Sequence, residues 1–95
     1  MPQRITPANL ADIIARINRT MDTPAEPYAL GADGRHHAQI GSYHLSGAYG
    51  GFSLHQVVNG GGTRDVFDCG HVPARELADR MHAFLSGVYS ARGLQ

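Results

Sequence analysis

Apolar side chains recur at helical spacing in two segments, one near each end of the chain. In the first segment they fall at every third or fourth position and form one stripe: Leu10, Ile13, Ile14, Ile17 and Met21. Thr6 is a favourable N-cap residue, and Pro7 suits the first helical position because its φ angle is already fixed. The pattern therefore predicts a helix over residues 7–21, which Pro24 separates from the next element.

A second stripe of the same kind lies near the C-terminus and consists of Leu77, Met81, Phe84, Leu85 and Val88. Polar side chains occupy the positions between them, as expected for a helix with one face on a core: Arg75, Glu76, Asp79, Arg80 and Ser86. Pro73 again suits a first helical position. This segment predicts an amphipathic helix over residues 73–89.

The segment between the two helices alternates in the manner of β-strands. Residues 28–32 predict a short strand, and Asp33-Gly34 predicts a two-residue type I′ hairpin turn. Residues 35–47 then predict a longer strand. After a glycine-rich turn at residues 59–62, residues 63–68 predict the last strand.

The stretch YHLSGAYGGFSLHQVV, residues 43–58, predicts a hairpin whose two-residue turn is Gly50-Gly51, since glycine adopts the positive φ angles of a type I′ turn. This register places six apolar side chains on one face: Tyr43, Leu45, Tyr49, Phe52, Leu54 and Val58. It sets Ser46 across from His55 on the opposite face. That face is small and polar, and we take four of its residues as a candidate interaction face: His44, Ser46, Ser53 and His55.

Two apolar helix stripes require one apolar sheet face to cover. The predicted fold is therefore α+β, with two layers. An N-terminal helix, an antiparallel sheet of three or four strands and a C-terminal helix follow in order, with both helices on one sheet face. The 95 residues are expected to form a single domain, residues 1–95, with an ordered core over about residues 6–90.

Composition narrows the classes of function. Eight arginines balance eight acidic residues and lysine is absent, so the formal net charge is zero and the basic stripe of a nonspecific nucleic-acid binder is missing. The single cysteine, Cys69, allows no internal disulfide and fits a reducing compartment, so we expect a cytoplasmic protein. The sequence begins without the apolar segment of a signal peptide, and no apolar run approaches the length of a membrane span.

Several residue groups suggest chemistry without completing a motif. The loops GAYGG and NGGGTR resemble phosphate-binding loops, but both lead into strands and lack the lysine of such loops. His44 with His55, or Cys69 with His71, offers metal-ligand types, yet one cysteine at this spacing matches no zinc pattern. Ser46 and His55 on an open sheet lack an oxyanion hole. We expect no metal ion, no other cofactor and no enzymatic activity.

The start of the second helix is a candidate anion site. His71 and Arg75 lie in the sequence CGHVPAR, where the free N–H groups of the first helical turn point outward. Every helix start has such N–H groups, so ordinary capping is the simpler interpretation of these two residues.

Residues 40–90 resemble small uncharacterised proteins encoded in phage and prophage regions of proteobacterial genomes. The resemblance lies in AYGG (48–51), SLHQVV (53–58), DVF (65–67) and GHVPARELADRMHAF (70–84). It implies a bacterial or phage-associated origin and carries no functional residue with it.

We expect a non-enzymatic protein-binding or self-association module, with a homodimer as the first expectation and an unknown protein as the other partner. Nucleic-acid binding is the alternative, because double-stranded RNA-binding domains share the element order helix, three strands, helix. It would require a surface cluster of arginines from Arg16, Arg19, Arg64, Arg75 and Arg80. A small metal-dependent enzyme is the second alternative.

Overall fold

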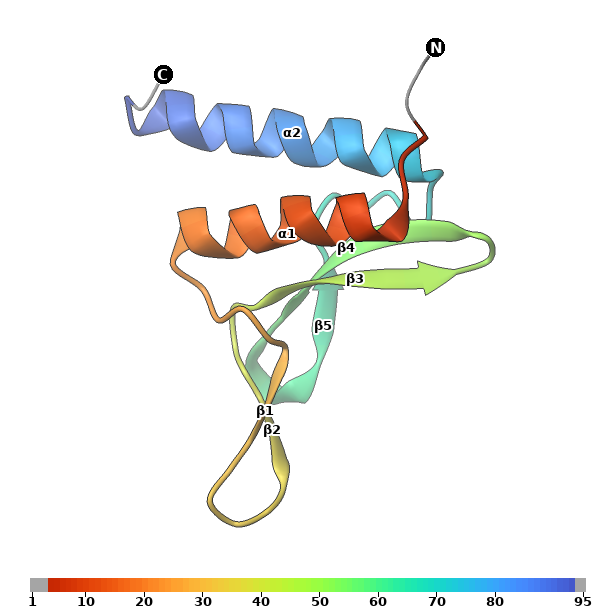
Figure 1. Cartoon of the computed structure of the whole chain (residues 1–95). Coiled ribbons are helices and arrows are strands. Elements are labelled where there is room, and N and C mark those ends of the chain that lie inside the picture. Colours follow the sequence, from red (N-terminus) through yellow and green to blue (C-terminus); the bar gives the residue numbers. More distant parts are fainter. Residues whose placement is uncertain (1–3, 94–95) are drawn as a thin grey trace.

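The computed structural model describes residues 4–93, which form an α+β fold of two helices and five strands (Figure 1). In chain order the elements are α1 (Pro7–Met21), β1 (Tyr28–Leu30), β2 (His36–Ala38), β3 (Tyr43–Ala48), β4 (Gly51–Val57), a short 3-10 turn η1 (Asn59–Gly61), β5 (Thr63–Asp65) and α2 (Ala74–Ala91).

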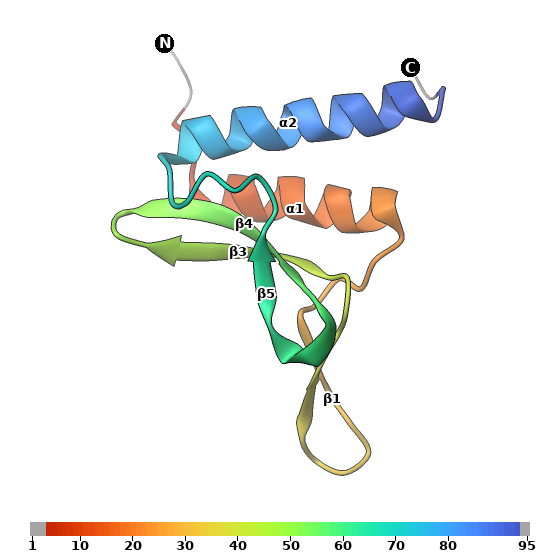
Figure 2. The same ribbon diagram turned by 180° about the vertical axis from the view of Figure 1, so that it is seen from behind.

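The predicted two-layer architecture is confirmed. Strands β3, β4 and β5 form an antiparallel sheet in that order, and α1 and α2 lie side by side over one of its faces (Figures 1 and 2). Helix α1 packs on β3, and α2 packs on β4. The core between the layers is built from both helix stripes and the apolar face of the sheet: Leu10, Ile13, Ile14, Ile17, Tyr43, Leu54, Leu77, Ala78, Met81 and Leu85.

Both predicted helices are present, with small differences at their ends. Helix α1 has the predicted bounds, and it starts with a reciprocal capping box in which Thr6 and Asn9 each bond to the backbone of the other. Asp22 ends it in the left-handed conformation, with φ 57°. In α2, Pro73 is the N-cap rather than the first helical residue, and the helix runs to Ala91, two residues beyond the predicted end.

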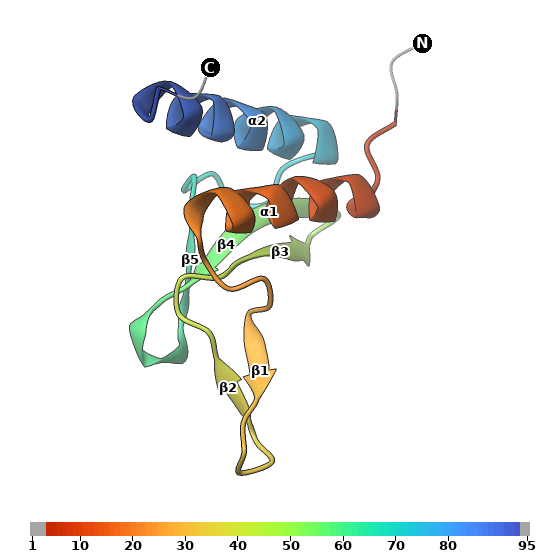
Figure 3. The same cartoon turned by 60° about the vertical axis from the view of Figure 1, so that its left-hand side comes forward.

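The predicted long strand over residues 35–47 is interrupted. Strand β2 ends at Ala38, and a turn that includes Gly41 at φ 95° changes the direction of the chain before β3 begins. Strands β1 and β2 consequently pair only with each other, in a separate two-stranded sheet. This hairpin, which we call the arm, projects away from the helices and the main sheet (Figure 3).

The turn of the arm also differs from the prediction. Leu30 pairs with His36, so the loop contains five residues rather than the two residues Asp33-Gly34. The Asp33 carboxylate accepts hydrogen bonds from the Arg35 backbone N–H, at 3.0 Å, and contacts the His37 ring, also at 3.0 Å. These side-chain contacts fold the loop back on itself, a role that aspartate commonly has in turns.

The last strand is shorter than predicted because the chain turns at Asp65. Its carboxylate accepts hydrogen bonds from the backbone N–H groups of Phe67, Asp68 and Gly70. After this loop the chain returns to β4, where Val72 and Phe52 exchange two backbone hydrogen bonds of 2.8 and 2.9 Å. Strand β4 is therefore flanked on both sides, by β3 on one and by β5 and Val72 on the other.

The central hairpin turns one residue earlier than predicted. Ala48 pairs with Gly51, so Tyr49 and Gly50 form the loop, with φ angles of 54° and 73°. Gly51 lies in β4 instead, where an added Cβ would come within 3.0 Å of the Val72 carbonyl oxygen. Moving the turn by one residue shifts the strand pairing by two. The residues of β3 and β4 therefore keep the faces predicted for them, although their partners change. Tyr49 does not: it was predicted on the apolar face, but it lies in the loop and is 99% exposed.

Candidate interaction surfaces

The polar face of the β3–β4 hairpin brings together all four residues of the candidate interaction face. His44 lies directly opposite His55, and Ser46 directly opposite Ser53. The predicted pairing of Ser46 with His55 is wrong because of the shifted turn. The rings of His44 and His55 meet edge to face, with centroids 5.8 Å apart.

The loop that follows β5 contributes one side chain to this polar face. Its residue His71 reaches Ser46, with 3.0 Å between Nε2 and Oγ, and its ring centroid lies 6.0 Å from that of His55. Figure 2 shows this loop running along β4 towards the start of that strand before α2 begins. Ser53 is completely buried, so only part of the predicted face is open to a partner.

Two polar atoms of this face are buried without a hydrogen-bond partner in the described chain: the His44 Nδ1 and the Ser53 Oγ. Burial, with a smaller contribution from the charge of His55, lowers the pKa of His44 below its usual value of 6.5. Burial would raise the pKa of Asp65, but the hydrogen bonds from Gly70 and its neighbours outweigh it and lower that pKa. After Gly70, the Ser53 hydroxyl is the next cause that lowers the pKa of Asp65, ahead of the N–H groups of Phe67 and Asp68, although its Oγ lacks the geometry of a regular hydrogen bond.

The two residues of the candidate anion site lie on different elements. His71 lies in the loop and is directed to Ser46 on the sheet. Arg75 is an exposed residue of the first turn of α2, whose N-cap, Pro73, provides no side-chain hydrogen bond. The structure thus gives His71 a partner on the sheet, a contact that no local sequence pattern indicated.

The candidate groups for metal and nucleophilic chemistry are not assembled into a site. Within residues 4–93, no three His, Cys, Asp or Glu side chains are arranged to hold a metal ion. Cys69 is a free thiol whose hydrogen bond goes to the carbonyl of its neighbour Gly70.

The five arginines of the nucleic-acid alternative are distributed over three elements: Arg16 and Arg19 on α1, Arg64 on β5, and Arg75 and Arg80 on α2. Arg80 forms an ion pair with Glu76 at 3.1 Å, and Arg64 donates a hydrogen bond to Gln56. The arm also separates α1 from the three-stranded sheet along the chain, which departs from the element order of double-stranded RNA-binding domains.

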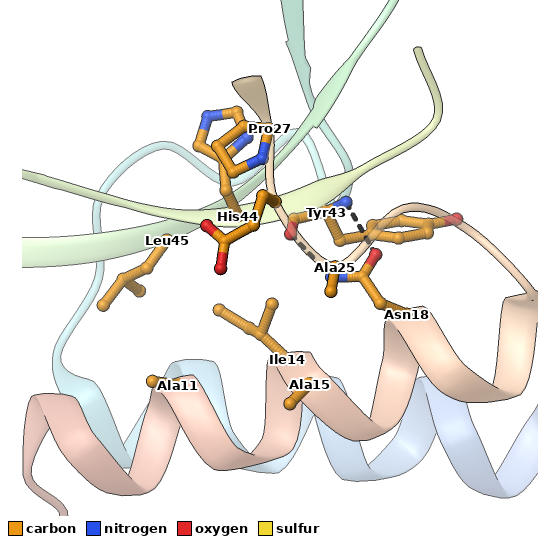
Figure 4. A pocket seen from close by; sticks show the side chains of 10 residues that line it. Ala11, Ile14, Ala15, Asn18, Ala25, Pro27, Tyr43, His44 and Leu45 are labelled. Atoms are coloured by element: carbon orange, nitrogen blue, oxygen red, sulfur yellow. Dashed lines mark hydrogen bonds between the residues drawn. The ribbon is translucent and has the colours of Figure 1, made fainter. Parts of the chain in front are cut away.

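A cavity lies between α1 and the outer edge of β3, at a place that the sequence did not indicate. Its volume is about 350 Å³, and Ala11, Ile14 and Ala15 of α1 line one side, with Tyr43 and Leu45 of β3 across from them (Figure 4). The connection from α1 to the arm closes one end.

Asn18 joins α1 to β3 beside this cavity. Its side-chain amide donates to the Tyr43 carbonyl at 3.0 Å and accepts from the Tyr43 N–H at 2.9 Å, as the dashed lines of Figure 4 show. Thr23 Oγ1 donates to the same amide oxygen at 2.7 Å. A polar residue within an otherwise apolar helix stripe was the signal that could have identified this contact.

The arm carries the other surface that sequence analysis missed. Tyr28 and Leu30 alternate along β1 and therefore share one face, and they are 50% and 65% exposed. Ile40, at the base of the arm, is 58% exposed. Isolated apolar side chains are common on protein surfaces, but two on one face of a projecting hairpin form a patch.

Comparisons of the chain with protein-family models, with curated proteins and with solved structures gave no match. Within residues 4–93, neither helix has the length and apolar character needed to cross a membrane.

Proposed function

We propose that the protein is a non-enzymatic protein-binding module that self-associates through its arm. The observation that carries this proposal is the exposed apolar face of β1, formed by Tyr28 and Leu30. Two-stranded hairpins are marginally stable in water unless a third strand or another element covers them. In residues 4–93, β1 and β2 pack against each other and hardly against the helices or the main sheet.

The net charge of the chain and the unpaired edges of the arm both favour a second copy of the chain as the partner. The net charge of zero means that two copies do not repel each other over long range. Both outer edges of the two-stranded arm are unpaired in the described chain, so the arm of another copy can extend it to four strands around a two-fold axis. We also propose that this association takes place in the cytoplasm, since the one cysteine is a free thiol.

Light scattering over a range of concentrations tests the proposal. We expect the purified chain to show twice the monomer mass at high concentration, and we expect Leu30→Arg to shift it to the monomer. Full burial of a leucine side chain stabilises an interface by roughly 1.5–3 kcal/mol, and each copy contributes one. The matched control is Ala32→Arg, an exposed position in the loop of the arm.

A wild-type chain that stays monomeric at the highest concentration would show that self-association is wrong. A dimer that Leu30→Arg leaves intact would show that it forms through another surface. Circular dichroism of both variants verifies that the helices are retained, so that a loss of dimer is not mistaken for unfolding.

A further inference from the structure

The outer edge of β3 presents backbone hydrogen-bonding groups that no strand of residues 4–93 pairs with. The turn at Tyr49-Gly50 makes Ala48 and Gly51 a hydrogen-bonded pair, and pairs of this kind alternate along an antiparallel ladder. The N–H and C=O groups of His44 and Ser46 therefore point to β4. Those of Tyr43, Leu45 and Gly47 point outward, at the edge of the sheet.

Asn18 occupies one end of this edge. Its amide bonds to both outward groups of Tyr43, as the backbone of a neighbouring strand would. The outward groups of Leu45 and Gly47 come next along the strand, and the cavity lies beside Leu45. Residues 4–93 thus cover the edge at Tyr43 and leave it open over the residues that follow in β3.

Strand β3 also lacks the features that usually protect an edge from pairing. Its sequence, YHLSGA, has no charged residue and no proline, and it pairs with β4 without a bulge. The opposite edge of the sheet provides a contrast within the same molecule. There β5 has three residues, and Arg64 and Asp65 are two of them.

The cavity next to this edge has the size and lining to hold an apolar side chain. The side chains that α1 presents beside Leu45 are small, because they belong to the exposed alanines Ala11 and Ala15. This leaves room for an added strand between the helix and the edge of the sheet. Among the described residues that line the cavity, Glu26 is the only formally charged one. A carboxylate at the rim of an apolar pocket favours a ligand with a basic residue close to its apolar one.

We propose that the groove between α1 and β3 binds an extended segment of a partner protein. The segment pairs with the backbone of Leu45 and Gly47 as a fourth strand, places an apolar side chain in the cavity and sets a lysine or arginine beside Glu26. This is strand addition to a sheet edge, in which backbone bonds give affinity and the side-chain pocket gives selectivity.

The position of α1 favours a free segment over a second copy of this chain. Since Asn18 reaches the outward groups of Tyr43, α1 extends over the edge of β3. Two copies paired β3 to β3 around a two-fold axis would bring their α1 helices to the same side of the joined sheet, where they would collide. A segment without an attached helix avoids this collision. The inference is independent of self-association through the arm.

A phage-displayed library of random heptapeptides, selected on the immobilised full chain, is the test. We expect enriched peptides to share an apolar residue with lysine or arginine at a fixed spacing. A synthetic copy of the best peptide should lose at least about tenfold in affinity for Ala15→Trp, which fills the cavity, because a buried apolar side chain is then excluded. Glu26→Lys should weaken it by up to about fivefold, as expected for one exposed ion pair.

Matched variants on α2 separate these effects from general damage. Ala83→Trp and Asp79→Lys make the same changes at exposed positions away from the groove, and they should leave the affinity unchanged. Methylation of alternate backbone nitrogens of the peptide should abolish binding, since a strand pairs through its N–H groups.

Three results would overturn the proposal: a library without enrichment, a peptide that binds Ala15→Trp as well as wild type, or a peptide that tolerates backbone methylation. A wild-type dimer that Ala15→Trp dissociates would show that a second copy occupies the groove, and would also overturn it. None of these outcomes depends on whether Leu30→Arg changes the oligomeric state.

Discussion

Replacement of Asn18 by alanine should destabilise the fold more than any other single polar substitution in α1. Asn18 is 2% exposed, and its amide makes three hydrogen bonds, two with the backbone of Tyr43 and one with the hydroxyl of Thr23. Alanine removes all three and leaves the Tyr43 N–H and C=O without partners at a residue that is itself 4% exposed. A buried polar group left unsatisfied destabilises by about 1–3 kcal/mol.

Two unsatisfied groups should lower the free energy of unfolding by about 2–6 kcal/mol. The better helix propensity of alanine offsets about 0.5 kcal/mol of this loss. The free energy of unfolding of a native protein is about 5–15 kcal/mol, so the Asn18→Ala variant should be close to the limit at which it still folds. Urea denaturation followed by far-UV circular dichroism measures the change in the free energy of unfolding, at a protein concentration low enough to keep the chain monomeric. The control is Arg19→Ala, an exposed neighbour, which should stay within about 0.5 kcal/mol of wild type.

Amide hydrogen exchange of Tyr43 gives a second, local measurement on the same variants. Its amide should be protected in wild type and in Arg19→Ala, and should exchange much faster in Asn18→Ala. A stability loss below about 1 kcal/mol together with a Tyr43 amide that remains protected would refute the reasoning. It would show that Asn18 does not satisfy the edge of β3.

Two further predictions concern the polar face and the central hairpin. Gly51→Ala should lose about 1–3 kcal/mol of unfolding free energy in urea denaturation, because its Cβ would press on the Val72 carbonyl. Gly47→Ala is the control and should be close to neutral, because no atom lies closer than 3.9 Å to its added Cβ. Equal losses in the two variants would contradict the role of this close contact. The lowered pKa of His44 means that its contribution to stability is complete above about pH 6.5 and decreases as the pH falls toward its folded-state pKa. His44→Gln should flatten the dependence of stability on pH in that window, and an unchanged dependence would contradict the role given to His44. The lowered pKa of Asp65 affects stability only below about pH 3.8, outside this window.

The helices were predictable because their signals are local. The spacing of apolar residues fixes which side of α1 is buried, and Thr6 with Asn9 determines where the helix begins. These contacts all fall within one or two helical turns, so a pattern along the sequence contains them. The fold class followed, since two such stripes need a common sheet face.

The four residues of the polar face were predictable from the alternation of the strands, but the contacts of Asn18 and His71 join distant residues, and this is why the sequence did not reveal them. Residue 18 bonds to residue 43, and His71 bonds to Ser46, each across 25 positions. The hairpin of the arm was predicted, but its separation from the main sheet was missed, for a different reason. Residues 35–47 read as one strand because glycine at position 41 is compatible with a strand, and only the fold shows that Gly41 has a φ angle of 95°.

The glycine pair at residues 50 and 51 shows how far pattern reasoning extends. A turn at residues 49–50 and a turn at residues 50–51 give the strand residues on either side of the loop the same faces, so the apolar pattern of those residues does not distinguish the two turns. Local preference favours two glycines in the loop, yet the structure places Tyr49 there at φ 54° and keeps Gly51 in the strand. The decisive contact is with the backbone of His71 and Val72, about twenty residues later, where a Cβ on residue 51 would come within about 3.1 Å of three atoms. A residue that has no room for a side chain must be glycine, whereas a turn position tolerates a tyrosine at some conformational expense. The close approach of two backbones therefore determines the register, and with it the pairing of His44 with His55.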